Sequence, residues 1–351
     1  MRLGQIEIQT LLDITSLHAP MVEVFHEATR EALDPYRSWL EPDALCPHTQ
    51  RIRIPVQAYL VRTRHHRILI DTCVGCGKNQ PDAPDWHERS DASWLERLAA
   101  AGYAPEDIDY VFCTHLHSDH CGWNTRQRDG RWVPTFPNAR YVFSRLEYEA
   151  TAQLGGAAFE QSVLPVAEAG LMQLVDLDFA LDDEVWLEPA LGHTEGHVVV
   201  NLKSGVRRAA MCGDLMHSPV QCPHPEWSPV WDRDAERARR TRRSFLERHC
   251  DTDTLVLTAH FPRRRWAGSC RIADRARGAG FCFGTGSERD GCSAVCGKAG
   301  SSRHRAATSS LSIVLQDHEP SRTAPRQRGA ADGHWGRAEL WLALELLNGS
   351  S

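Results

Sequence analysis

The sequence predicts an α/β protein in which two mixed β-sheets pack face to face and helices cover both outer faces, an αββα sandwich. Two observations predict it. Short apolar segments of strand length alternate with segments of helical period, and several predicted strands end at histidine and aspartate residues. The 351 residues, 42% of them apolar, suffice for a substantial core in one large domain or two smaller ones.

The N-terminal part of the chain contains three predicted strands. Residues 3–14 alternate as a strand does, and residues 56–61 and 67–71 form two strands joined by a polar turn. The irregular residues 17–50 carry several aromatic side chains. Two interpretations of this segment stay open: a substrate-binding flap over a cavity mouth, or a packed loop that buries its own apolar residues.

The later elements alternate between helix and strand. An amphipathic helix is predicted over residues 90–101, ending before Gly102, with an apolar face made of Ala92, Leu95, Leu98 and Ala99. Ser144 is a predicted N-cap for a helix reaching about residue 152, with Glu147 at the capping-box position. The charged residues 233–249 predict a solvated outer helix. Further strands are predicted over residues 109–113, 141–143, 171–177, 184–188, 209–214 and 255–258.

A CxxC motif, Cys73-Val74-Gly75-Cys76, follows the third predicted strand. A thiolate zinc site needs four ligands, and the sequence has no second cysteine pair nearby. A redox motif normally opens a helix, whereas Gly75 and Gly77 indicate a loop. We therefore expect no chemical role for Cys73 and Cys76.

The strand over residues 109–113 runs into His115-Leu116-His117-Ser118-Asp119-His120, with three histidines and one aspartate in six residues. Such a cluster is costly to desolvate without a cation, and imidazole and carboxylate are ligand types that zinc prefers. In an extended segment His115 and His117 point the same way and can bind one ion. Asp119 and His120 follow after a turn and can bind a second. Two ions about 3.5–4 Å apart can share a bridging hydroxide that is nucleophilic at neutral pH.

This motif resembles the signature of the metallo-β-lactamase-fold hydrolases. Three later motifs agree with the resemblance in order and distance: Gly192-His193-Thr194-Glu195-Gly196-His197, Cys212-Gly213-Asp214 and Thr258-Ala259-His260. The resemblance covers roughly residues 1–262, which we expect to form the hydrolase domain, and it implies the αββα fold of that family.

The resemblance also implies a role for each matching residue. His193 would complete the ligands of the first metal, Asp214 would bridge the two metals, and His260 would be the third ligand of the second. Asp71 would orient the metal ligands by hydrogen bonding, and His197 would be structural or would support a ligand. The implied cofactors are two Zn²⁺ ions, with iron or manganese as alternatives. The expected metal ligands are His115, His117, His193, Asp119, His120, Asp214 and His260.

Within the family, the segments around residues 71–75, 120–124 and 213–219 resemble quorum-quenching lactonases, so we expect hydrolysis of an ester or lactone such as an acyl-homoserine lactone. Asp119 would pass a proton to the leaving group. His217 stands where related lactonases have a tyrosine that binds the substrate carbonyl; it would do this, protonate the leaving oxygen, or be a surface histidine. The alternatives are a phosphotriesterase, a thioesterase, an iron-dependent sulfur dioxygenase and an inactive binding module.

The charge distribution separates the C-terminal segment from the rest of the chain. Residues 263–351 contain 14 Arg and Lys against 8 Asp and Glu, which leaves 26 basic and 38 acidic residues in residues 1–262. An acidic catalytic body disfavours nucleic acid as a partner and leaves a small ester or lactone as the expected one. The sequence does not indicate an oligomeric state.

No apolar segment is long enough to span a membrane, and the N-terminus lacks a signal-peptide core. We therefore expect a cytoplasmic protein with most of its 12 cysteines reduced.

Residues 263–351 are rich in Arg, Gly and Cys and do not resemble the usual family ending. Two hypotheses stay open for this tail: a frame-shifted product that was never selected to fold, or a genuine disordered or partner-binding extension.

Overall fold

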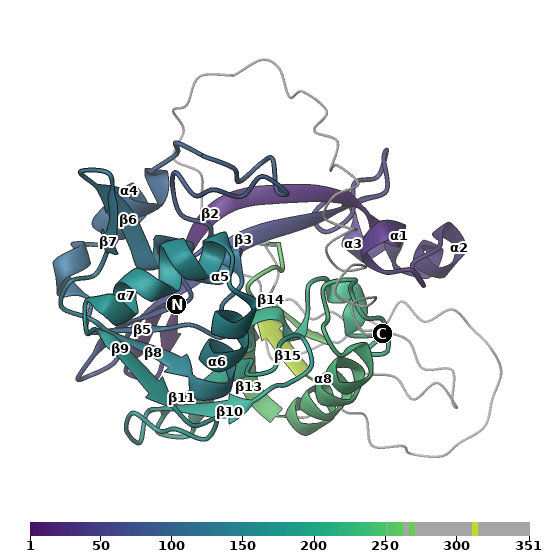
Figure 1. The fold of residues 1–351 in the computed structure, drawn as a ribbon. Coiled ribbons are helices and arrows are strands. Elements are labelled where there is room, and N and C mark those ends of the chain that lie inside the picture. The colour runs from purple at the N-terminus through teal and green to yellow at the C-terminus, as the bar shows by residue number, and fades with distance from the viewer. Residues whose placement is uncertain (251, 263–266, 271–310, 315–351) are drawn as a thin grey trace.

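The computed structural model describes residues 1–250, 252–262, 267–270 and 311–314, and within them two large sheets and a small hairpin (Figure 1). The first sheet has seven strands in the order β1-β2-β3-β4-β5-β8-β9. They are β1 (Arg2–Leu3), β2 (Ile6–Pro20), β3 (Arg51–Arg62), β4 (Arg67–Ile70), β5 (Tyr110–Phe112), β8 (Arg140–Ser144) and β9 (Met172–Val175). β1 to β4 are antiparallel neighbours, and β4, β5, β8 and β9 are parallel, so the sheet is mixed.

The second sheet has six strands in the order β10-β11-β12-β13-β15-β14. They are β10 (Val185–Pro189), β11 (Val198–Ser204), β12 (Arg207–Met211), β13 (Thr252–Leu257), β14 (Ala267–Cys270) and β15 (Leu311–Val314). This sheet is also mixed, because β12 pairs with β13 in parallel while β10, β11 and β12 are antiparallel. The separate hairpin pairs β6 (Thr125–Arg128) with β7 (Arg131–Pro134).

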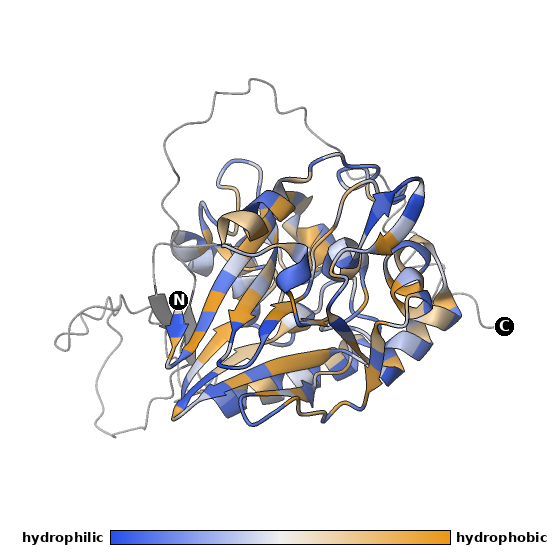
Figure 2. Cartoon of the chain, turned by 90° about the vertical axis from the view of Figure 1, so that its left-hand side faces the viewer, coloured by the Kyte–Doolittle hydropathy of each residue, from blue (hydrophilic) through white to orange (hydrophobic). Residues whose placement is uncertain are grey.

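Side chains alternate between the two faces of each strand, and this alternation explains how the layers of the fold pack together. Ile68 and Ile70 of β4 belong to a buried cluster that also contains residues of β10, β11 and β12, so this cluster lies between the sheets. Leu69, between them in sequence, points to the other face and packs in the cluster that contains Trp94 and Leu98 of α4 (Ser93–Ala100). Figure 2 shows the hydrophobic colour concentrated on the strands.

Helices cover the outer face of the second sheet as well. Phe245 and Leu246 of α8 (Ala235–His249) pack with Val199 and Val256 of that sheet. The remaining helices are α1 (Met21–Val24), α2 (Arg30–Leu33), α3 (Arg37–Leu40), α5 (Ser118–Cys121), α6 (Arg145–Leu154) and α7 (Leu164–Glu168). The predicted αββα sandwich is therefore confirmed. None of the helices in the described ranges is long and apolar enough to cross a lipid bilayer.

The segment predicted as an irregular flap or packed loop is more regular than expected. β2 continues to Pro20, and α1 to α3 follow at the end of the β2–β3 hairpin (Figure 1). Phe25 and Leu40 are fully buried, as a packed segment requires. The Val230 amide donates a hydrogen bond to the Val24 carbonyl, so α1 also contacts the loop that precedes α8.

Several predicted boundaries were wrong. The helix predicted over residues 90–101 is α4, which begins at Ser93 and buries Trp94 and Leu98. Ala99, which was predicted to lie on the apolar face, is exposed. β12 ends at Met211, so Asp214 lies in the following 3-10 turn rather than at a strand end. β11 and the β6–β7 hairpin were not predicted. Helix α8 begins at residue 235 and is not wholly solvated, because Arg242 is fully buried.

The predicted C-terminal tail contributes two described segments, β14 and β15, which pair with each other and with β13. These eight residues are strands. The remaining residues of the tail lie outside the described ranges, so the division of the chain at residue 262 stays a prediction.

Candidate metal centre

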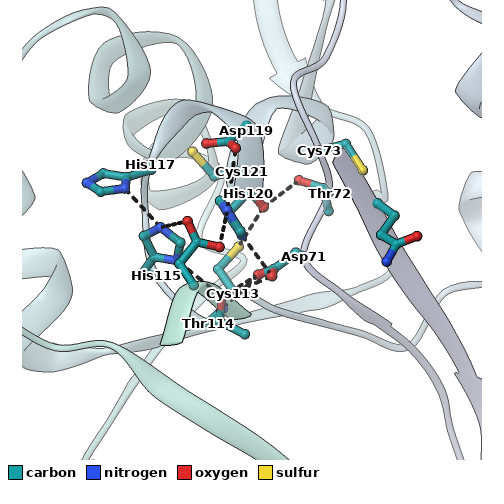
Figure 3. Close-up of polar contacts among 12 residues, drawn as sticks. Asp71, Thr72, Cys73, Cys113, Thr114, His115, His117, Asp119, His120 and Cys121 are labelled. Atoms are coloured by element: carbon teal, nitrogen blue, oxygen red, sulfur yellow. Dashed lines mark hydrogen bonds and ion pairs between the residues drawn. The ribbon is translucent and has the colours of Figure 1, made fainter. Parts of the chain in front are cut away.

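The HxHxDH segment follows β5 as a loop that leads into the single turn of α5. Figure 3 shows its imidazoles and carboxylate gathered above Asp71. His115 and His117 lie in the loop and turn toward each other, with His115 Nε2 3.0 Å from His117 Nδ1. Asp119 and His120 lie on α5, where the chain changes direction. One short segment therefore presents two pairs of candidate ligand atoms.

His193 joins the first pair from the turn after β10. Its Nε2 lies 3.1 Å from His117 Nδ1. Gly192 precedes it with a φ of +127°, a conformation that side chains rarely adopt, and a Cβ here would lie 2.2 Å from the Ala238 nitrogen of α8. The turn that presents His193 therefore requires glycine both for its backbone angle and for its close approach to α8.

His260 joins the second pair from the end of the segment after β13. Its Nε2 lies 3.5 Å from Asp119 Oδ2, and His120 Nε2 lies 3.6 Å from the same oxygen. Three ligand atoms from two distant parts of the chain thus face one another, as the resemblance implied.

Asp214 lies between the two groups and directs one oxygen at each. Its Oδ1 is 3.0 Å from both His120 Nε2 and His260 Nε2. Its Oδ2 is 3.3 Å from His193 Nε2 and 3.7 Å from His115 Nε2. The carboxylate therefore lies between the two candidate ligand groups, with one oxygen facing each.

Four of the histidines that present Nε2 have their Nδ1 engaged elsewhere, whereas Nδ1 of His217 has no hydrogen-bond partner among the described residues. His120 Nδ1 lies 2.9 Å from Asp71 Oδ2, and His260 Nδ1 lies 2.8 Å from the Pro55 carbonyl oxygen. A carboxylate or carbonyl only accepts, so Nδ1 carries a proton, and Nε2 is the nitrogen that a metal can take by displacing any proton there. His115 Nδ1 lies 3.2 Å from Thr114 Oγ1, and His193 Nδ1 lies 3.0 Å from Asp232 Oδ1.

Asp71 lies where the resemblance implied, beneath the metal loop (Figure 3). In addition to contacting His120, its Oδ1 accepts a hydrogen bond of 2.7 Å from the Thr114 amide. Cys73 and Cys76 are both free thiols in the described chain, and burial raises the pKa of each. Among the residues that the structure describes, neither belongs to a group of candidate metal ligands.

The electrostatics of the cluster depend on burial and on the aspartates. Burial holds the pKa of His115 and His117 well below the usual value, so both imidazoles are neutral. Burial also opposes protonation of His120, but the charges of Asp214 and Asp119 outweigh it and raise the pKa. Burial opposes ionisation of Asp214 too, yet the surrounding imidazoles hold the pKa of this carboxyl well below its usual range. The aspartates thus attract positive charge into this site.

The donor set fits a divalent metal. His120 Nε2 and Asp214 Oδ1 are buried and lie 3.0 Å apart, but neither forms a hydrogen bond within the described chain. Buried polar atoms without partners are costly, and imidazole nitrogen with carboxylate oxygen suits zinc and related metals. A cation between them would satisfy both atoms and replace the protons that the aspartates otherwise draw onto the imidazoles.

His217 and His197 lie beside the cluster in different ways. His217 is 2% exposed, so the surface alternative is wrong, and its Nε2 lies 3.1 Å from Asp214 Oδ2. Burial lowers the pKa of His217 to about 4. His197 Nε2 accepts a hydrogen bond of 3.0 Å from the Asp214 amide, and His197 is not among the grouped ligand atoms.

Sequence reasoning missed two acidic residues that hold the histidine loops. Glu147, predicted only as part of a capping box, accepts hydrogen bonds from the Leu116 and Gly196 amides with its two oxygens. It therefore links the loop of His115 and His117 to the loop that carries His193. Asp232, the partner of His193, was not predicted, because no local motif marks a residue 39 positions away.

An αββα sandwich with a His/Asp cluster of this composition defines a metal-binding protein of hydrolase architecture. The chain belongs to the Metallo-beta-lactamase superfamily, whose family model matches residues 51–260. This confirms the family and the fold that the motifs predicted.

The curated relatives include lactonases. An N-acyl homoserine lactonase from Bacillus cereus is 27% identical in an alignment of 174 residues, and the match covers 44% of this chain and 62% of the relative. N-acyl homoserine lactonase AiiB from Agrobacterium fabrum is 33% identical in an alignment of 95 residues, and that match covers 24% of this chain and 34% of the relative. The chain thus matches less than two thirds of the length of these relatives.

Solved structures share the fold. AidC, described as a dizinc quorum-quenching lactonase in complex with a product, superposes with a TM-score of 0.64 at 23% identity, covering 83% of this chain and 97% of AidC. A probable metal-dependent hydrolase from Staphylococcus aureus gives 0.60 at 20% identity, covering 74% and 91%. At these identities the likeness concerns the fold alone.

Proposed function

We propose that this chain is a metal-dependent hydrolase that cleaves the ester or lactone bond of a small molecule, such as an acyl-homoserine lactone. The observation that carries the proposal is the position of Asp214, whose two oxygens face two separate histidine groups. The lactonase relatives support this choice of substrate class. Two zinc ions, or an iron or manganese pair, would supply a shared hydroxide at neutral pH and polarise the substrate carbonyl.

The chain's own residues would hold and orient these groups. His115, His117 and His193 would hold the first ion, and Asp119, His120 and His260 the second, with Asp214 shared between them. Asp119 is the partly exposed carboxylate of the set, with 12% of its side chain accessible. From there it would accept the proton released in the attack and pass it to the leaving oxygen.

The proposal is tested by assaying zinc-loaded protein against acyl lactones, aryl esters, thioesters and phosphotriesters. We expect turnover of lactones or aryl esters. Turnover of phosphotriesters or thioesters instead would place the activity of this chain in another branch of the family. In the same assay, His117→Ala removes a ligand of the first ion and should lower kcat/KM by more than about 10-fold, the lower end of the effect of losing only a ligand's hydrogen-bond partner. Comparable turnover by His117→Ala, or oxygen consumption in place of hydrolysis, would contradict the proposal.

We also propose that His217 donates an N–H hydrogen bond to the substrate carbonyl. Its lowered pKa of about 4 leaves the imidazole uncharged at neutral pH and without a spare proton for the leaving oxygen. Its buried imidazole lies against Asp214, and its ring centroid is 5.3 Å from that of His260. Replacing His217 by phenylalanine keeps a ring and should lower kcat by about 10²- to 10³-fold, the usual effect of removing one donor to the developing oxyanion. Zinc content should stay unchanged, and the exposed His65→Ala is the control. Loss of zinc in His217→Phe would show that His217 is a ligand instead.

A further inference from the structure

A fully buried ion pair lies directly behind His193. Asp232 Oδ2 is 2.9 Å from Arg242 Nη2, and both side chains are 0% exposed. Burying such a pair carries a large desolvation penalty, which only good geometry and additional hydrogen bonds offset. The pair is therefore an unusual feature for a surface helix such as α8, and its surroundings show what it supports.

The Arg242 guanidinium donates hydrogen bonds to three backbone carbonyl oxygens. Its Nε donates to the Leu215 carbonyl at 2.7 Å, and its Nη1 donates to the Pro225 and Trp227 carbonyls at 2.9 Å each. Leu215 follows Asp214, the carboxylate between the two histidine groups. The guanidinium therefore joins α8 to the segment of the proposed bridging ligand and to the loop before α8.

Asp232 is held in turn by two donors. Its Oδ2 accepts a 2.8 Å hydrogen bond from Ser228 Oγ in addition to the contact with Arg242. The other oxygen, Oδ1, contacts His193 Nδ1 at 3.0 Å. Since an ionised carboxylate has no proton to donate, the Nδ1 proton must belong to His193. Nε2 is then the nitrogen left for a metal, and it faces His117 and Asp214.

Backbone contacts hold the same turn. The Arg233 amide donates to the His193 carbonyl at 3.1 Å, and the Asp234 amide donates to the Gly192 carbonyl at 2.9 Å. Thr241 Oγ1 on α8 donates to the Leu191 carbonyl at 2.7 Å. The residues around Asp232 and the first half of α8 are thus the base on which the His193 turn rests.

We propose that Asp232 is a positioning residue that selects the Nδ1-protonated tautomer of His193, and that Arg242 and Ser228 hold Asp232 for this purpose. A ligand histidine whose other nitrogen donates to a carboxylate is fixed in ring orientation and is a stronger donor to the metal. The affinity of the first metal site therefore depends on α8, which contributes no ligand. The metal-affinity consequence rests on the proposed function, whereas the tautomer does not.

The test uses Asp232→Asn, which changes one oxygen into an amide with little change of shape. Arg242 and Ser228 are both donors, so the remaining oxygen turns toward them and the amide NH₂ faces His193 Nδ1. An NH₂ group donates, so Nδ1 must accept and the proton moves to Nε2, where it blocks the metal. The matched control is Asp234→Asn, at the N-cap of α8, where asparagine caps as well as aspartate.

The direct readout is the ring ¹⁵N spectrum of the metal-free full chain, with the His193 signals identified by their absence in His193→Gln. Burial opposes protonation of His193, but hydrogen bonds to Asp214 and Asp232 outweigh it and raise its pKa to about 9, so the spectrum is recorded well above that pH, where the ring carries one proton. We expect Nδ1–H in the wild type and in Asp234→Asn, and Nε2–H in Asp232→Asn. Competition with a chelator should then show zinc affinity at one site about 10- to 100-fold weaker in Asp232→Asn.

The two readouts separate the two proposals. An Nε2–H tautomer in the wild type, an unchanged tautomer in Asp232→Asn, or zinc affinity equal to that of the wild type would each overturn the role of Asp232. Failure of the wild type to bind zinc would overturn the proposed function instead, and the tautomer of the metal-free chain would still decide the role of Asp232.

Discussion

Replacing Asp214 by alanine is expected to abolish hydrolysis and to lower the zinc content of the protein. This carboxylate contacts both histidine groups, with Oδ1 3.0 Å from His120 and His260 and Oδ2 3.3 Å from His193. Without it, the five buried imidazoles that contact Asp214 would converge with no negative charge between them to attract a cation. Losing only the hydrogen-bond partner of a ligand costs about 10- to 100-fold, so losing this shared ligand should lower kcat/KM by more than about 100-fold.

The matched control for Asp214→Ala is Asp176→Ala, because the Asp176 side chain is 84% exposed and makes only a distant contact with Arg145. Its activity and zinc content should match those of the wild type. Zinc counting after gel filtration, together with kcat/KM, measures both. Asp214→Ala protein that kept two zinc ions and full turnover would show that the carboxylate is not shared by the ions.

Replacing Arg242 by methionine is expected to give the largest loss of stability. The substitution leaves Asp232 buried without its cation. It also removes the donor to the Leu215 and Pro225 carbonyls and one of the two donors to the Trp227 carbonyl. Breaking a buried pair on one side costs about 3–5 kcal/mol in the free energy of unfolding. Urea denaturation of the metal-free protein measures the loss.

The control for Arg242→Met is Arg240→Met on the same helix. The Arg240 side chain is 64% exposed and pairs with the exposed Glu236, a contact worth at most about 1 kcal/mol. The double variant Arg242→Met/Asp232→Asn should be less destabilised than the sum of the two single losses, because no unpaired charge remains. Equal losses in Arg242→Met and Arg240→Met would contradict the structural role of the buried pair.

The sequence predicted the parts of the site in which the chemistry is local. His115, His117, Asp119 and His120 lie within six residues, so their composition alone indicates a cation. His193, Asp214 and His260 were predictable only through motif order, since the packing of the two sheets brings them together. The strand over residues 67–71 was predicted as well, and the structure packs its alternating residues against the opposite sheet and against α4.

The supporting residues could not be predicted because their roles arise from tertiary contacts. Glu147 lies 31 and 49 positions from the two amides that it links, and its local pattern indicated only a helix cap. Arg242 lies in a helix so rich in charge that burial of one guanidinium has no sequence signal. The helix boundary errors have a similar origin, since burial of Trp94 rather than local period selects the packed face of α4.

The shared position of Asp214 between two metal ions is tested most directly by crystallography of zinc-loaded protein at the zinc absorption edge. We predict two anomalous peaks about 3.5–4 Å apart. One should be surrounded by His115, His117 and His193, the other by Asp119, His120 and His260, with one Asp214 oxygen on each. A single peak, or two peaks of which only one contacts Asp214, would contradict the account.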